Sequence, residues 1–172
     1  MGFCLFNNIA LAARHAQNKL GIKRILIVDW DLHHGNGTED IFRDDKDIFY
    51  FSTHQSPFYP GTGLQSNSHL LNIPIKGKPG SRLEILNAFN TRLLPEMQRF
   101  KPELVLISAG FDAHKLDPLG SLDLETEDYG TLTRIVKKIA NDYSLGRILS
   151  LLEGGYNPEA LAASARLHYE EL

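Results

Sequence analysis

Apolar positions along the chain follow two kinds of pattern, and each kind predicts a different element. Short continuous apolar runs rich in β-branched residues, such as Ile25-Leu26-Ile27-Val28, are typical of strands buried on both faces of a parallel sheet. Longer stretches that repeat apolar residues every three or four positions are typical of amphipathic helices. These patterns predict strands over residues 25–28, 47–52, 70–75, 104–107 and 148–152, and helices over 7–20, 81–100, 126–143 and from 157 onward.

Local signals refine the helix predictions. Ser81 followed by Glu84 three residues later predicts a capping box, and Pro95 predicts a kink or a split in the same helix. Asn157 before Pro158 predicts the start of the last helix. The alternation of strands and helices predicts an α/β fold with three layers, a mostly parallel sheet with helices on both faces. No linker or repeat interrupts this alternation, so we expect residues 1–172 to form a single domain.

Composition and charge exclude several classes of protein. Hydrophobic residues make up 42% of the chain, as in ordinary globular proteins. The formal net charge of −3 provides no basic field for nucleic acid or for an anionic membrane, and no apolar run approaches the ~20 residues of a membrane span. A single cysteine, Cys4, excludes an intrachain disulfide, and we expect it to be a small buried residue. We expect a cytoplasmic protein, or a nuclear one in a eukaryote.

Chemically useful side chains follow three of the predicted strands. Asp29, Asp31 and His33 come after the first strand with a spacing of two, so they share one face if the segment stays extended. Asp112 follows the fourth strand and would complete three ligands for zinc, iron or manganese, leaving one position open. Two other interpretations remain: an acidic surface loop with a hydrogen-bonded histidine, and a metal-dependent phosphohydrolase that uses Asp29, Asp31 and His33.

Other polar and aromatic residues complete this edge of the sheet. Tyr156 follows a Gly-Gly pair, which lets the backbone turn sharply, and its hydroxyl could stabilise an oxyanion. Phe58 and Tyr59 precede a tight turn and could line a channel. His34 would face away from His33 in an extended segment, so we expect it to support the site or the core and not to bind the metal.

Five motifs occur in an order that resembles a known family. They are Gly2-Phe3-Cys4-Leu5-Phe6-Asn7-Asn8, Asp29-Trp30-Asp31-Leu32-His33-His34-Gly35-Asn36-Gly37, Pro60-Gly61-Thr62-Gly63, Ala109-Gly110-Phe111-Asp112 and Glu153-Gly154-Gly155-Tyr156. Together they resemble the zinc-dependent histone deacetylase family, which includes bacterial acetylpolyamine amidohydrolases. Asn36 and Glu153 resemble the class II and bacterial branch.

The resemblance implies an arginase-like fold that hydrolyses the amide of an acetylated lysine in a protein or of an acetylated small amine. It implies one catalytic zinc ion held by Asp31, His33 and Asp112, with Tyr156 polarising the acyl carbonyl. The substrate-binding positions that it implies are Gly2, Phe3, Tyr59, Leu119 and Gly154. It also implies a structural monovalent cation, commonly potassium, surrounded by Asp29, Asp31, His33, Ser52 and Thr53.

The resemblance also implies that part of the family domain lies outside this chain. That domain is roughly twice as long, above the prior of ~150 residues for a single domain. Its general base is a pair of adjacent histidines, which we expect shortly before the Gly2-Phe3-Cys4 segment and so not among these 172 residues. Two hypotheses follow: the N-terminally incomplete part of a zinc-dependent deacetylase or amidohydrolase, or a non-catalytic metal-binding remnant or interaction module of the same fold.

Overall fold

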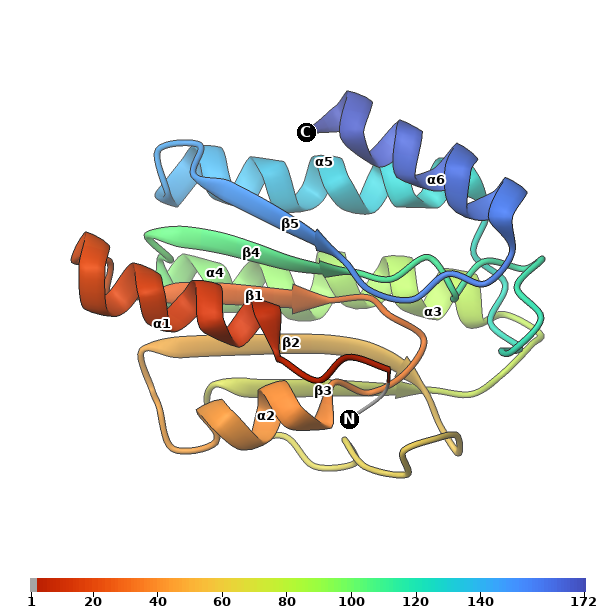
Figure 1. Cartoon of the computed structure of the whole chain (residues 1–172), viewed down its shortest axis with the longest axis horizontal. Coiled ribbons are helices and arrows are strands. Elements are labelled where there is room, and N and C mark those ends of the chain that lie inside the picture. The colour runs from red at the N-terminus through yellow and green to blue at the C-terminus, as the bar shows by residue number, and fades with distance from the viewer. Residues whose placement is uncertain (1–2) are drawn as a thin grey trace.

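The fold is built on a parallel sheet whose strands match the predicted ones. The computed structural model describes residues 3–172, and in it five strands lie in the order β3-β2-β1-β4-β5 (Figure 1). All four neighbouring pairs are parallel. The strands are β1 (Ile25–Asp29), β2 (Ile48–Gln55), β3 (Leu70–Ile75), β4 (Leu104–Ala109) and β5 (Ile148–Leu152).

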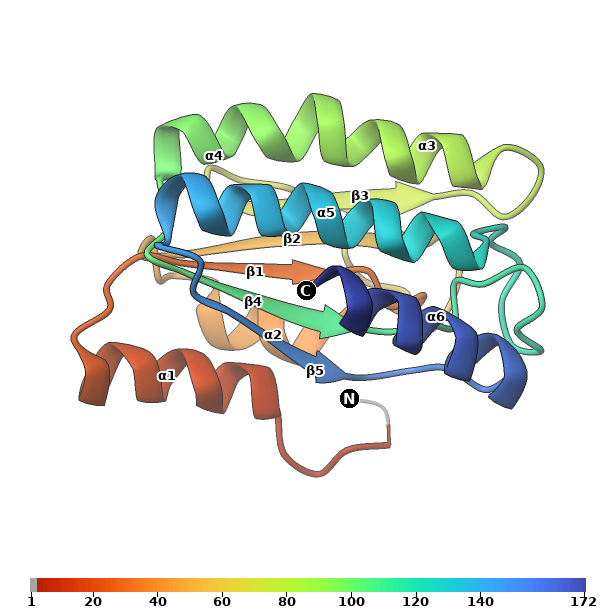
Figure 2. The ribbon, with the colours of Figure 1, turned by 90° about the horizontal axis from the view of Figure 1, so that it is seen from above.

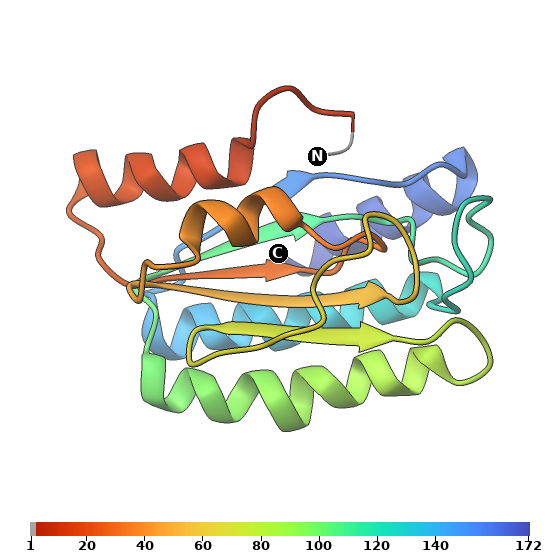
Figure 3. The same cartoon turned by 90° about the horizontal axis from the view of Figure 1, so that it is seen from below.

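Helices cover both faces of this sheet, as the α/β alternation predicts (Figures 2 and 3). They are α1 (Asn8–Leu20), α2 (Asn36–Phe42), α3 (Ser81–Ala88), the π-helical turn η1 (Phe89–Leu93), α4 (Leu94–Phe100), α5 (Thr126–Tyr143) and α6 (Pro158–Glu171). Alternate residues of β1 divide the core between the two faces. Ile25 and Ile27 pack with α1 and α2, whereas Leu26 and Val28 belong to the larger cluster under α3, α4 and α5.

Two local predictions about the helices fare differently. The capping box at Ser81 is wrong: Gly80 is the N-cap of α3, and the Ser81 hydroxyl donates instead to the Asp123 carboxylate. A capping box forms at α5, between Glu125 and Asp128. The split at Pro95 is confirmed, because the π-helical turn η1 separates α3 from α4 just before this proline.

The register of the sheet brings the carboxyl ends of the strands to one edge. Asp29 at the end of β1 lies beside Ser52 of β2 on one side and Ser108 of β4 on the other. The end of β5 lies level with the end of β4, where Ala109 pairs with Leu152. The loops that leave β1, β4 and β5 therefore begin side by side, as is usual for functional sites in open parallel sheets.

Candidate metal centre

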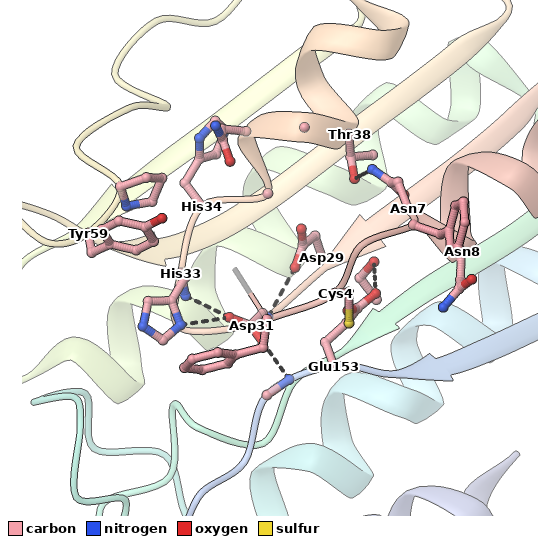
Figure 4. A pocket seen from close by; sticks show the side chains of 18 of the residues that line it. Cys4, Asn7, Asn8, Asp29, Asp31, His33, His34, Thr38, Tyr59 and Glu153 are labelled. Atoms are coloured by element: carbon pink, nitrogen blue, oxygen red, sulfur yellow. Dashed lines mark hydrogen bonds and ion pairs between the residues drawn. The ribbon is translucent and has the colours of Figure 1, made fainter. Parts of the chain in front are cut away.

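Three of the predicted ligands converge where these loops meet. The Nδ1 atom of His33 lies 3.1 Å from Asp31 Oδ1 (Figure 4). The same nitrogen lies 3.0 Å from Asp112 Oδ2. Asp31, His33 and Asp112 each offer one ligand atom, and these three atoms all lie within 4.8 Å of one another. Within residues 3–172, this is the group of at least three acidic, histidine or cysteine side chains placed closely enough to hold a metal ion. Asp112 is buried, while Asp31 and His33 are partly exposed, so the cluster has one open side.

Backbone groups hold the carboxylates in place. The Gly154 N–H donates to Asp31 Oδ2 at 2.8 Å, and the Leu32 N–H donates to Asp112 Oδ1 at 2.8 Å. The His33 N–H donates to Asp31 Oδ1 at 2.8 Å, so this oxygen also fixes the turn after β1. Gly110 and Gly154 press against this group, since a Cβ on either would lie 2.3 Å from a carboxylate oxygen of Asp31 or Asp112, respectively.

The donor set fits a divalent cation such as zinc. Zinc binds imidazole nitrogen and carboxylate oxygen at about 2.0–2.2 Å, so ligand atoms around a shared ion lie roughly 3–3.6 Å apart. The two His33–carboxylate distances fall in this range. Burial and the charge of Asp31 raise the pKa of Asp112, and hydrogen bonds to Asp112 and Asp31 raise the pKa of His33 to about 10. Two adjacent carboxylates in a partly buried site thus favour a positive charge between them.

Asp29 has a different role from its two neighbours in the motif. The strand ends at Asp29, and residues 31–33 form bends, so the prediction of one extended face for all three side chains is wrong. Asp29 Oδ2 accepts from the buried Tyr50 hydroxyl at 2.8 Å, and Oδ1 accepts from the Asp31 N–H at 3.1 Å. Burial and the charge of Asp31 raise the pKa of Asp29 well above its usual value.

His34 packs behind the cluster, as predicted. Its Nδ1 lies 2.7 Å from the Thr62 hydroxyl, its Nε2 lies 3.0 Å from Glu39 Oε2, and its ring is close to the His54 ring, with centroids 4.7 Å apart. Burial lowers the pKa of both imidazoles, that of His54 to about 4. The hydrogen bond between His34 and Thr62 joins the loop that carries Asp31 and His33 to the turn at residues 60–63. The sequence gave no sign of this contact between distant segments.

Tyr156 and the aromatic residues line a pocket beside the three candidate ligands. The pocket has a volume of about 470 Å³. The Phe3 ring meets the Tyr156 ring edge-on at 6.1 Å, and the Tyr59 ring lies 6.3 Å from the His33 ring. Burial, followed by the charges of Asp112 and Asp31, raises the pKa of Tyr156 to about 12. Asp117, which sequence reasoning missed, fixes this loop by accepting from the Tyr156 N–H at 2.8 Å.

The remaining predicted residues lie as follows. Leu119 and Gly154 also line the pocket, and the predicted position Gly2 is outside the described residues. Ser52 and Thr53 are buried in β2, next to Asp29 at the end of β1, but the predicted monovalent cation site stays a prediction. The prediction of a buried Cys4 is wrong. It is exposed and lines the pocket from the segment before α1 (Figure 4).

Comparison with known proteins identifies the family to which this site belongs. The model of the histone deacetylase domain matches residues 1–172. The chain belongs to the histone deacetylase family. It is 48% identical over 171 residues to Histone deacetylase 14, chloroplastic, of Arabidopsis thaliana, and the match covers 95% of this chain and 40% of that protein. It is 43% identical over 183 residues to Polyamine deacetylase HDAC10 of Mus musculus, covering 99% of this chain and 27% of the mouse protein.

A solved deacetylase structure confirms the fold. The crystal structure of the HDA15 HD domain superimposes with a TM-score of 0.90 at 40% identity, and the match covers 99% of this chain and 50% of that one. The chain thus spans half or less of the length of these deacetylases. No helix among residues 3–172 has the length and apolar character of a membrane span. One relative's name places it in the chloroplast, and the compartment of this chain stays a prediction.

Proposed function

We propose that this chain carries the metal-binding part of a zinc-dependent amide hydrolase that removes acetyl groups from lysine side chains or small amines. The observation that carries the proposal is the cluster of Asp31, His33 and Asp112, with donor atoms within 4.8 Å of one another, beside a pocket lined by Tyr156. Family membership supports the reaction type, because the relatives carry the names histone deacetylase and polyamine deacetylase. A solvated acidic loop does not account for a buried Asp112 hydrogen-bonded to His33.

Each residue of the site has a definite task in this proposal. A zinc ion bound by Asp31, His33 and Asp112 would supply Lewis-acid polarisation of the acyl carbonyl and a more acidic water. The Tyr156 hydroxyl is protonated at neutral pH, as tyrosine hydroxyls ordinarily are, so it can donate a hydrogen bond to the carbonyl oxygen as negative charge develops there. The Gly154 N–H holds Asp31 Oδ2, while Oδ1, which accepts from the His33 N–H, faces the His33 ring where the metal would bind.

The wall of the pocket supports an extended aliphatic substrate. Phe3, Tyr59 and Leu119 are largely exposed at the pocket and offer apolar surface on both sides of the cluster. An acetylated lysine presents four methylene groups before its amide, and an acetylated polyamine presents a comparable chain. Either substrate would lay its methylene chain along these apolar side chains and place its amide near the proposed metal and the Tyr156 hydroxyl.

A second ion site is part of the proposal. We propose a monovalent cation behind the catalytic metal, surrounded by Asp29, Asp31, His33, Ser52 and Thr53. Asp29 and Ser52 are buried and lie side by side in the sheet register, which supports the placement. A cation there would offset the burial and the neighbouring charge of Asp31, which raise the pKa of Asp29.

One observation favours the alternative of a metal-binding module without turnover. The histidines that line the pocket are His33, which we propose as a ligand, and His34, whose nitrogens face Thr62 and Glu39. Neither is free to act as a general base. General acid–base catalysis contributes typically ~10²–10⁴-fold to a rate, so turnover by this chain alone would be slow.

Acetate release by the zinc-loaded chain distinguishes the hydrolase from the metal-binding module without turnover. The purified 172-residue chain would be mixed with an acetyl-lysine peptide and separately with an acetylated polyamine, with metal content measured on the same sample. Tyr156→Phe removes the hydroxyl and keeps the ring, so we expect release to fall by about 10²-fold with zinc content unchanged. Stoichiometric zinc without any release would reject the hydrolase for this chain and support the metal-binding module. Equal release by the wild type and the variant would reject the role of Tyr156.

A further inference from the structure

Asp117 is a buried carboxylate that lies outside the candidate metal cluster. It is 8% exposed and belongs to the loop that leads from β4, past the candidate ligand Asp112, to α5. Its own N–H donates to the His114 carbonyl at 2.9 Å, which fixes the turn of this loop. Burying a carboxylate is costly unless its oxygens accept hydrogen bonds. The donors that Asp117 binds therefore show which part of the molecule it supports.

Each oxygen of Asp117 accepts from a residue that lines the pocket. Oδ1 accepts from the Leu119 N–H at 2.9 Å, and Oδ2 accepts from the Tyr156 N–H at 2.8 Å. Leu119 and Tyr156 both line the pocket beside the candidate metal ligands. One carboxylate thus fixes the apolar wall and the hydroxyl donor relative to each other. An asparagine could not replace it fully, because its NH2 group would face one of the two N–H donors.

The backbone before Tyr156 needs such a fixed point. Gly155 adopts a φ of 144°, in the region that favours glycine, so this part of the loop has more conformational freedom than another residue would give it. The hydrogen bond to Asp117 selects one of its conformations. The next residue adds a second contact, since Asn157 Nδ2 donates to the Leu116 carbonyl at 3.1 Å. The loop after β5 is therefore attached to the loop after β4 at two successive residues.

The loop that carries Asp117 also packs against the segment of the metal ligands. A Cβ on Gly120 would lie 2.5 Å from Leu32 Cδ1, so the loop and the Leu32 side chain are in close contact. Leu32 lies in the chain between two of the candidate ligands. The loop thus contacts the ligand segment through Gly120 and the Tyr156 backbone through Asp117. A shift of either contact would change the distance between the metal and the tyrosine hydroxyl.

We propose that Asp117 is a positioning residue of this site. It holds the Tyr156 hydroxyl and the Leu119 side chain in one arrangement relative to the metal ligands, so that a substrate whose methylene chain contacts Leu119 brings its carbonyl to Tyr156. The inference rests on the proposed hydrolase function. Asp117 acts through these two neighbours and not on the reacting atoms, so its loss should lower turnover and leave zinc affinity unchanged.

A double-mutant cycle tests whether Asp117 acts through the Tyr156 hydroxyl. Asp117→Asn keeps the size of the side chain but turns an NH2 group toward one N–H donor. We expect kcat for acetate release from an acetyl-lysine peptide, expressed per bound zinc, to fall by about tenfold. In the Tyr156→Phe background the same substitution should change kcat by less than about twofold, because the group that it positions is already absent. Equal losses in both backgrounds would show a general structural effect and would overturn the proposal.

Asp123 provides the matched control for this substitution. It belongs to the same loop, and its carboxylate also accepts from two donors, the Ser81 hydroxyl and the Arg82 N–H at the start of α3. Neither donor belongs to a residue that lines the pocket. Asp123→Asn should therefore leave kcat and KM unchanged. A loss of kcat as large as that of Asp117→Asn would assign the effect to the loop as a whole and would overturn the specific role of Asp117.

Hydrogen exchange followed by NMR separates this inference from the hydrolase function on which it rests. In the isotope-labelled, zinc-loaded chain, Asp117→Asn should speed exchange of the Leu119 or the Tyr156 amide by about tenfold, the value of one hydrogen bond, and Asp123→Asn should speed neither. Faster exchange in a chain that releases no acetate would reject the hydrolase and keep Asp117 as the residue that holds the pocket in shape. Unchanged exchange at both amides would overturn the proposal, whether or not the chain turns over substrate.

Discussion

At the scale of single residues, Gly154 is the most constrained position of the candidate metal centre. A Cβ at this position would lie 2.3 Å from Asp112 Oδ2 and 2.6 Å from Asp31 Oδ2. We expect Gly154→Ala to push both carboxylates out of position and to weaken zinc binding by about 10- to 100-fold, the usual cost of disturbing groups that orient metal ligands. Competition with a chromophoric chelator would measure the change in zinc affinity.

The matched control for this substitution is another glycine whose extra methyl group meets only flexible atoms. A Cβ on Gly130, within α5, would lie 3.1 Å from the side chain of Leu167 and far from the site. Gly130→Ala should leave zinc affinity unchanged. If Gly154→Ala bound zinc as tightly as Gly130→Ala, the placement of the metal between Asp31 and Asp112 would be wrong.

The residues of the site could be predicted only where the signal is local in the sequence. Asp31, His33 and Asp112 follow strand ends, and the carboxyl ends of neighbouring parallel strands meet, so their convergence follows from chain order. Asp117, which fixes the Tyr156 loop, left no such signal because its partner is 39 residues away. The expectation of an extended ligand segment failed because Asp29 and Asp31 each accept a backbone N–H two residues ahead, which bends the chain.

At the scale of elements, His168 fastens α6 to the sheet and to α5. Its Nδ1 lies 2.6 Å from the Thr133 hydroxyl of α5, and its Nε2 lies 2.8 Å from the Ser150 hydroxyl of β5. The imidazole is 5% exposed, and burial lowers the pKa of His168 from 6.5 to about 4. The folded protein therefore holds this histidine neutral over a pH range in which the unfolded chain protonates it.

This difference predicts a pH-dependent stability that one substitution should reduce. Between about pH 6.5 and pH 4, His168 binds a proton more readily in the unfolded chain than in the folded protein. The contribution of His168 to the free energy of unfolding is therefore complete above pH 6.5 and is lost as the pH falls. His168→Gln does not titrate, so its free energy of unfolding should fall less between pH 7 and pH 5. Urea unfolding at each pH would measure the free energy of unfolding of the wild type and of the variant. The fluorescence of Trp30 can follow it, because the ring centroids of Trp30 and His168 lie 5.4 Å apart. Parallel curves for the wild type and the variant would contradict the prediction.

Elements with a long or strongly apolar pattern were predictable, and short polar ones were not. The four buried strands, the partly exposed β5 and the helices α1, α5 and α6 agree with their patterns because packing and local preference favour the same conformation. The seven residues of α2 carry too few apolar positions to show a helical period, and the helix forms because Phe42 is buried against β1 and β2. At Ser81, the Asp123 carboxylate competes for the hydroxyl and the expected cap does not form.

At the scale of the whole molecule, the candidate metal centre connects parts of the chain that are distant in sequence. Asp31 leaves β1, Asp112 leaves β4, and the Gly154 N–H that holds Asp31 comes from the loop after β5. The alternation of strands and helices in the sequence predicts parallel strands, and the loops that follow parallel strands lie at one edge of the sheet.

Since the unfolded chain separates these ligands, zinc should bind the folded protein far more tightly and raise its stability. At a free zinc concentration 100 times the dissociation constant, the free energy of unfolding should rise by about 2.7 kcal/mol, and a chelator should reverse the increase. Asp112→Asn keeps the shape of the side chain and its acceptor for the Leu32 N–H, so the variant should fold but lose the response to zinc. Urea unfolding with zinc and with chelator would measure the effect in both proteins. An equal response in the variant would place the ion elsewhere, and no response in either protein would reject a zinc site at this cluster.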